Sequence, residues 1–197
     1  NPPPSPLSGS YNIYNILAAV LVTKNIGVSE QEIKSSLKSF TPAFGRQEIL
    51  KVDGKNVQIF LSKNPTSFNE SLRTIADLKA PARNATQSVA GGKNVLFVLN
   101  DRIPDGLDVS WIWDVDFEEI ADLRRMKIYI SGDRVYDLAL RLKYAGFSLS
   151  ETQIHADLKN AINAAVKVTP KNETLYILPT YSAMLEVRKI LTGKKIL

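Results

Sequence analysis

Several common kinds of active site are absent from this sequence. It contains no cysteine and a single histidine, His155. It can therefore form no disulfide, thiolate metal site or cysteine nucleophile, and it supports neither a histidine-rich metal cage nor two-histidine chemistry. His155 precedes a helix cap at Asp157, so we expect it to be structural. A glycine-rich phosphate loop of the form G-x-x-x-x-G-K-[ST] is also missing, because the Gly-Gly-Lys at residues 91–93 lacks its spacing. This chain alone is not expected to bind and cleave ATP.

Long apolar runs are missing as well. None approaches the length of a membrane span, and the first residues lack the basic-then-apolar order of a signal peptide. We therefore expect a cytoplasmic protein that does not span a membrane. The 197 residues, 44% of them apolar, are enough for one globular domain with a full core, or for a domain with a small appendage.

The net charge of +5 is scattered along the chain. The basic clusters at residues 124–127 and 194–195 are not interleaved with aromatic residues, as they tend to be in proteins that bind single-stranded nucleic acid. We therefore expect no nucleic-acid binding. The positive charge can still help to bind an anionic ligand such as a nucleotide phosphate.

Residues 99–118 form the most informative segment, because they contain five aspartates and both tryptophans of the chain. Carboxylates repel one another and cost free energy when desolvated. The segment is therefore either a wet surface loop or a site that uses its charge, and we favour the site. Trp111 and Trp113 would lie on one side of a locally extended chain, where core or interface packing explains them.

Two other chemistries are open to this segment. Asp101, Asp105 and Asp108 could form an oxygen cage for Mg²⁺ or Ca²⁺, although their spacing does not match an EF-hand. Aspartates near tryptophans also occur in sugar-cleaving hydrolases, but nothing in the spacing selects that reading. We predict no metal site.

The first 43 residues predict a lead and a small helical unit. Residues 1–8 are rich in proline and serine and indicate a disordered lead. Within residues 9–43, Ser10 is expected to cap a first helix, and Ser29 with Glu32 forms a capping box for a second. A hinge is expected at the end of this unit, over residues 41–45.

Residues 44–197 predict an α/β domain. A turn at Asp53-Gly54 joins the first two strands into a hairpin, and strands and helices alternate from residue 93 onward. This order predicts an open, mostly parallel sheet flanked by helices, and Asp137 with Arg141 is placed for an i,i+4 pair. The expected strands cover residues 47–52, 57–62, 95–99, 127–131, 153–155 and 175–178. One helix is expected to begin at Asn64-Pro65, and four more are expected at residues 116–123, 135–142, 157–167 and 181–191. Residues 80–92 are predicted to be a loop or an exposed helix extension.

Ligands of such sheets lie at the carboxyl ends of the strands. Four loops carry polar residues to that edge: residues 63–65, 100–113, 132–134 and 179–181. Arg46, which follows the hinge, is either a surface arginine or a cation that reaches across a domain cleft to phosphate oxygens.

Seven segments of the chain carry a resemblance to known proteins: residues 11–19, 44–48, 63–65, 99–101, 105–114, 141–146 and 178–181. Together they resemble one family, the C-terminal domain of MurT, which is the Mur-ligase-like subunit of lipid II isoglutaminyl synthase. The resemblance implies a Rossmann-like Mur ligase C-terminal domain over residues 44–197. It also implies that residues 9–43 are a helical remnant of the Mur ligase central domain.

The resemblance implies a function in peptidoglycan synthesis at the inner face of the membrane. MurT pairs with the glutaminase GatD, and the complex uses ATP and ammonia to convert the D-glutamate α-carboxylate of the lipid II stem peptide into an amide. Asp108 would complete the Cys-His pair of GatD. ATP and Mg²⁺ would be bound mainly by a central domain that this sequence lacks, so this chain alone is expected to be inactive.

The family also implies roles for other residues. Those expected to contact the nucleotide are Arg46, Lys63 and Asn64. Those expected to face the substrate are Arg134, Thr180, Tyr181 and Ser182. Those expected at the partner interface are Asp105, Trp111, Trp113 and Asp114. Two alternatives stay open: an interaction domain that only docks the glutaminase, and a Mur-type ligase domain that adds an amino acid.

Overall fold

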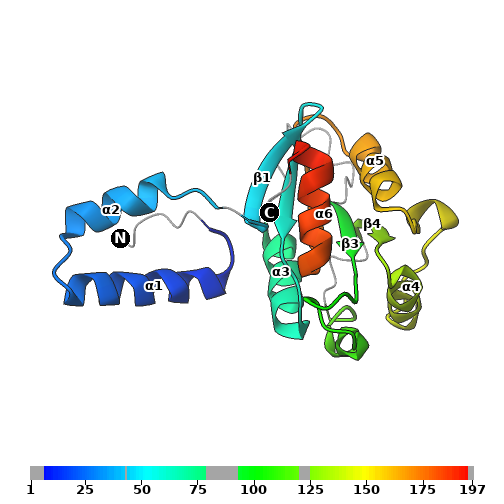
Figure 1. Ribbon diagram of the computed structural model, residues 1–197, viewed down its shortest axis with the longest axis horizontal. Helices are drawn as coiled ribbons and strands as arrows, with labels where there is room; N and C mark the ends of the chain where they lie inside the picture. The colour runs from blue at the N-terminus through cyan, green and yellow to red at the C-terminus, as the bar shows by residue number, and fades with distance from the viewer. Residues whose placement is uncertain (1–6, 43, 79–92, 120–124, 195–197) are drawn as a thin grey trace.

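The computed structural model describes residues 7–42, 44–78, 93–119 and 125–194. A pair of helices, α1 (Ser10–Asn25) and α2 (Glu30–Ser39), projects from one side of an α/β domain (Figure 1). Most of the predicted proline-rich lead and the predicted loop at residues 80–92 lie outside the described residues. Within those ranges, no helix is both long and apolar enough to cross a membrane.

A five-stranded sheet forms the centre of the α/β domain, in the order β1-β2-β5-β3-β4. The strands are β1 (Arg46–Val52), β2 (Lys55–Phe60), β3 (Asn94–Val98), β4 (Lys127–Ser131) and β5 (Thr174–Pro179). Strands β1 and β2 form the antiparallel hairpin, and the other neighbours are parallel. Asp53 and Gly54 adopt φ angles of 50° and 74°, as a tight primed turn requires. The predicted mostly parallel sheet is confirmed.

Helices cover both faces of the sheet. They are α3 (Pro65–Asp77), α4 (Val135–Tyr144), α5 (Leu158–Val168) and α6 (Tyr181–Thr192). Side chains alternate along β3, so Val95 and Phe97 pack with α3 and α4, whereas Leu96 and Val98 pack with α5 and α6. The predicted helix starts at Asn64-Pro65 and Asp157 are confirmed, since both side chains cap the helix that follows.

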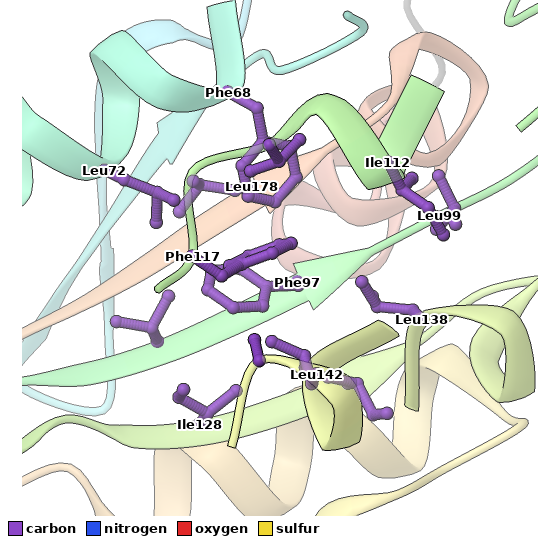
Figure 2. Packing of buried hydrophobic residues seen from close by; sticks show 14 of the residues in the cluster. Phe68, Leu72, Phe97, Leu99, Ile112, Phe117, Ile128, Leu138, Leu142 and Leu178 are labelled. Carbon is purple, nitrogen blue, oxygen red and sulfur yellow. The ribbon is translucent and has the colours of Figure 1, made fainter. Parts of the chain in front are cut away.

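An aromatic cluster anchors the acidic segment to the core. Phe117 comes from that segment and packs against Phe68 of α3 and Phe97 of β3, with ring centroids 5.5 Å and 5.8 Å away (Figure 2). Phe117 is 1% exposed and Phe97 is fully buried. Burial of an aromatic side chain stabilises a fold by about 1.5–3 kcal/mol. Phe117 therefore anchors the C-terminal end of the acidic segment in the core.

The helical pair is tied to the sheet through Gln47 of β1. The Gln47 amide accepts a hydrogen bond from the Ser8 N–H (2.8 Å) and donates to the Ser8 carbonyl oxygen (2.7 Å) and the Tyr11 hydroxyl (3.1 Å). The capping box of Ser29 is confirmed. The prediction that Ser10 caps the first helix is wrong: Gly9 is the cap and Ser10 the first helical residue.

Three local predictions are also wrong. Asp137 pairs with Arg134 rather than Arg141, whose guanidinium is drawn toward the acidic segment. Residues 153–155 do not form a strand, because a 3-10 helix (η3, Glu151–Gln153) is followed by a single bridge at Ile154. Residues 117–119 form a turn rather than the start of a helix, and the rest of that predicted helix lies outside the described residues.

Candidate functional site

The loops after the parallel strands meet at Asn100, which lies two residues after the end of β3 and is 2% exposed. The Asn100 backbone N–H donates to the Thr180 hydroxyl (3.0 Å), and its side-chain amide donates to the Ser182 hydroxyl (3.1 Å). The Asn100 side-chain oxygen accepts from the Asp133 N–H (3.0 Å). The predicted convergence of these three loops is confirmed. Sequence reasoning missed the organising role of Asn100; its signal is an amide directly after the strand predicted at residues 95–99.

Asp105 lies at the N-terminus of α6. Its carboxylate accepts hydrogen bonds from the Ser182 N–H (2.8 Å) and from the Ser182 hydroxyl. A carboxylate is favourable there because the helix dipole and unpaired N–H groups attract negative charge. Asp105 therefore closes the loop onto α6, while the Thr180 and Ser182 side chains are buried in internal hydrogen bonds. Tyr181, between them, is only half-buried.

Arg134 is paired with two carboxylates. It donates to Asp101 (3.0 Å) and to Asp137 (2.7 Å and 3.1 Å), and this bonding lowers the pKa of Asp137. Asp101, Asp105 and Asp108 thus have different partners and do not form the oxygen cage considered above. Across the residues that the structure describes, no group of three or more acidic or histidine side chains could hold a metal ion.

Asp108 lies at the start of a short 3-10 helix, η1 (Ser110–Asp114). Its carboxylate accepts a hydrogen bond from the Ser110 N–H at 2.8 Å, and this backbone bond, with the Ser110 side chain, lowers the pKa of Asp108. The side chain is exposed, and no arginine or lysine in the described ranges forms an ion pair with it. Asp108 is therefore an ionised carboxylate that is oriented by its own backbone and open to a partner.

A buried arginine holds η1 in place. Arg141 of α4 is 3% exposed and donates to the carbonyl oxygens of Ile112 (3.1 Å) and Val115 (2.7 Å). It also forms two hydrogen bonds with the Glu118 carboxylate, at 2.6 Å and 2.8 Å, which lower the pKa of Glu118. Because these acceptors follow Asp108 in the chain, Arg141 fixes the segment that presents Asp108.

Helix α3 holds the same segment from the other side. Asn69 donates to the Asp116 carboxylate (2.8 Å) and accepts from the Asp116 N–H (2.9 Å). The expectation that the two tryptophans share one side is wrong, because a 3-10 helix turns residues two positions apart away from each other. Trp111 packs against Phe68, whereas Trp113 is 48% exposed and packs against Tyr144.

A cavity of about 410 Å³ lies where α1 meets the end of β2 and the first turn of α3. Arg46, Lys63 and Asn64 line it together, as expected of residues that serve one ligand. Tyr11 and Asn15 of α1 line it too; sequence reasoning did not assign these two to a site, although they lie in one of the segments that carry the family resemblance. Among the described residues, no carboxylate forms an ion pair with Arg46 or Lys63, so both cations are available to an anion.

Comparisons with known proteins match most of the chain. The family described as MurT ligase C-terminal matches residues 61–184. The lipid II isoglutaminyl synthase (glutamine-hydrolyzing) subunit MurT of Streptococcus pneumoniae is 33% identical over 190 residues, which are 96% of this chain and 40% of that protein. The subunit of the same name from Staphylococcus aureus is 36% identical over 139 residues, 71% of this chain and 29% of that protein. The chain therefore spans less than half the length of these relatives.

Solved structures match the fold over nearly the whole chain. MurF from Acinetobacter baumannii superposes with a TM-score of 0.65 at 22% identity, covering 96% of this chain and 39% of that one. Folylpolyglutamate synthase from Mycobacterium tuberculosis gives a TM-score of 0.62 at 18% identity, covering 97% of this chain and 42% of that one. The expected fold, that of a Mur ligase C-terminal domain, is confirmed.

Proposed function

The chain belongs to the MurT ligase C-terminal family, and from this premise we propose that it is the C-terminal part of a lipid II isoglutaminyl synthase subunit. The proposed reaction converts the D-glutamate α-carboxylate of the lipid II stem peptide into an amide. Ammonia would come from glutamine, released by a GatD-type glutaminase partner. We propose that the reaction takes place in the cytoplasm, at the inner face of the membrane that carries the lipid-linked substrate.

One observation carries the catalytic part of the proposal: Asp108 is exposed, ionised and rigidly presented in a chain that lacks cysteine. The single histidine of the chain contacts the Thr152 carbonyl oxygen (3.0 Å) and stacks on Tyr129, so it is engaged elsewhere. We propose that Asp108 accepts the N–H of a histidine from the glutaminase. It would fix the imidazole tautomer and stabilise the imidazolium beside a partner thiolate.

The cavity at α1 supports the nucleotide part of the proposal. Arg46 and Lys63 form no ion pair with any described residue, and Asn64 caps α3 directly after Lys63. Cationic side chains of this kind bind phosphate oxygens. ATP and Mg²⁺, bound mainly outside this chain, would supply the phosphoryl group that activates the substrate carboxylate. Residues 9–43 would then be a remnant of the central domain, and their first helix, α1, would contribute one wall of the cavity.

Substrate binding is proposed at the α6 turn. Arg134 is 35% exposed and still has a face open to solvent beside its two aspartates. We propose that Arg134 and Tyr181 contact the substrate, and that Thr180 and Ser182 shape the turn through their bonds to Asn100. Asp105 and Asp114 are proposed to border the glutaminase. Because ATP binding lies mainly elsewhere, this chain alone is proposed to be inactive as a ligase.

Asp108→Asn tests the proposal in a complex with a GatD-type glutaminase. We expect the complex to form with unchanged affinity and glutamine hydrolysis to fall by about 10⁴-fold, the order seen when the orienting aspartate of a triad is replaced by asparagine. The matched control is Asp157→Asn, an exposed aspartate that also accepts a backbone N–H. Unchanged hydrolysis in Asp108→Asn would favour a pure docking domain. Failure of any glutaminase to bind would favour a ligase domain that adds an amino acid.

A further inference from the structure

Helix α4 exposes a line of large side chains. Tyr136, Leu140 and Tyr144 are spaced four residues apart, so they share one helix face, and they are 72%, 49% and 72% exposed. Trp113 of η1 extends this line, since its ring lies 5.5 Å from the Tyr144 ring. These four residues are called the α4 surface below. Figure 1 shows α4 at the far end of the domain from α1 and α2.

The α4 surface adjoins the residue proposed to reach the partner. Asp108 and Trp113 are five residues apart, so their Cα atoms are at most about 18 Å apart. From Tyr136 to Tyr144 the helix rises about 12 Å. A stable interface buries about 800 Å² per partner, a patch about 32 Å across. A partner that brings a histidine to Asp108 through an interface of this size therefore has room to cover the α4 surface as well.

The composition of this surface is that of an interface core. Tryptophan and tyrosine are enriched at protein interfaces and dominate binding energy there. On the η1 side the surface is bordered by the exposed carboxylates of Asp108 and Asp114. The complementary partner is expected to present an apolar patch with a basic border on that side.

The η1 end of this surface, at Trp113 and Tyr144, is held in place before binding. The Arg141 guanidinium lies 5.4 Å from the Trp113 ring and is itself fixed by the Ile112 and Val115 carbonyl oxygens. A preorganised aromatic surface loses little conformational entropy on binding. Tyr144 of α4 also contacts the Trp113 ring edge-on.

We propose that the α4 surface is the docking site of the glutaminase subunit, which it seats so that the partner's histidine meets Asp108. This inference rests on the proposed function and extends it from one carboxylate to a defined surface. It assigns two separate tasks to neighbouring groups: the α4 surface sets affinity, and Asp108 sets turnover.

The test separates affinity from turnover. Tyr144→Ala and Leu140→Arg are titrated against a GatD-type glutaminase while complex formation and glutamine hydrolysis are both followed. We expect the dissociation constant to rise by about 10-fold or more for each variant, with turnover restored at saturating chain. The matched control is Tyr14→Ala on α1, which removes a tyrosine of nearly equal exposure, 73%. Unchanged melting temperatures confirm that the variants fold.

Each outcome has a distinct meaning. If the wild-type chain binds and Asp108→Asn abolishes hydrolysis, but the α4 variants bind as tightly as Tyr14→Ala, the docking inference is refuted and the proposed function stands. If no glutaminase binds the wild-type chain, the proposed function itself fails. If the chain alone dimerises in sedimentation experiments and Tyr144→Ala abolishes the dimer, a second copy occupies the surface and the inference is overturned.

Discussion

Replacing Arg141 with methionine tests how much the acidic segment depends on one buried guanidinium. Methionine keeps most of the apolar volume but removes every hydrogen bond that Arg141 donates. Two of these bonds reach the backbone carbonyl oxygens of Ile112 and Val115, residues that are 2% and 1% exposed. Without these bonds, two buried carbonyl oxygens each lose a hydrogen-bond donor. A buried acceptor that loses its donor costs more free energy of unfolding than an exposed one, because water cannot replace the donor.

The magnitude follows from the contacts. A hydrogen bond from a charged donor contributes about 1.5–3 kcal/mol. Both carbonyl oxygens keep a second backbone donor, from Val115 at 3.4 Å and from Phe117 at 2.9 Å, so the lower end of this range applies to each. The Glu118 carboxylate is 49% exposed and adds about 1 kcal/mol at most. We expect Arg141→Met to lower the free energy of unfolding by about 3–4 kcal/mol, and the melting temperature by about 6–16 °C.

Urea unfolding measures this loss, and tryptophan fluorescence reports where it occurs, because both tryptophans of the chain lie in η1. The matched control is Arg73→Met, whose guanidinium is 49% exposed and pairs with Glu70 and Asp116. We expect it to cost about 1 kcal/mol or less. A loss in Arg141→Met no larger than in this control, with unchanged fluorescence, would refute the reasoning.

Three further outcomes are expected. Gly132→Ala destabilises the fold by about 3 kcal/mol or more, because its φ is 108° and a Cβ would lie 2.3 Å from a carbonyl oxygen; Gly27→Ala, with a φ of 89° and open space, costs less in the same urea experiment. Gln47→Ala releases the segment before α1, so limited proteolysis cuts it faster than in the wild type. The Glu118 pKa is lowered by Arg141, so the pair stabilises the fold fully above pH 4.5 and this stabilisation is lost as the pH falls through the lowered value. The stability difference between wild type and Glu118→Gln should therefore shrink between pH 7 and pH 3, and a constant difference would contradict it.

Most of the fold follows from local signals in the sequence. The Asp53-Gly54 turn, the capping residues Ser29, Asn64 and Asp157, and the alternation of strands and helices all appear in the structure where they are predicted. These signals depend on neighbours a few residues away, so a single sequence contains them.

The choice of side-chain partners could not be predicted in the same way. Arg141 has Asp137 one helical turn away, yet it pairs with Glu118, 23 residues distant. The reason is tertiary: two buried carbonyl oxygens of the acidic segment need a donor, and a surface pair offers less. The predicted alignment of Trp111 and Trp113 failed for a related reason, because packing on Phe68 favours a 3-10 turn over an extended chain.

The sequence predicts where the candidate site lies, but not which side chains contact one another there. Parallel strands bring their carboxyl ends together, so the convergence of the loops could be expected from topology alone. That Asn100 joins three of them could not, because it depends on which donors and acceptors face one another after folding.

Helix α3 contacts both the cavity and the acidic segment. Its first turn lines the cavity that Lys63 also lines. Asn69, in its second turn, forms two hydrogen bonds with Asp116 of the acidic segment, which also contains Asp108. A helix of 13 residues is about 20 Å long and tilts as one stiff rod. Asn69 lies four residues after Pro65, only about 6 Å along the axis, so a shift of the first turn moves Asn69 and its contact with Asp116 as well. A ligand bound in the cavity and a protein bound to the acidic segment would therefore both act on the same helix.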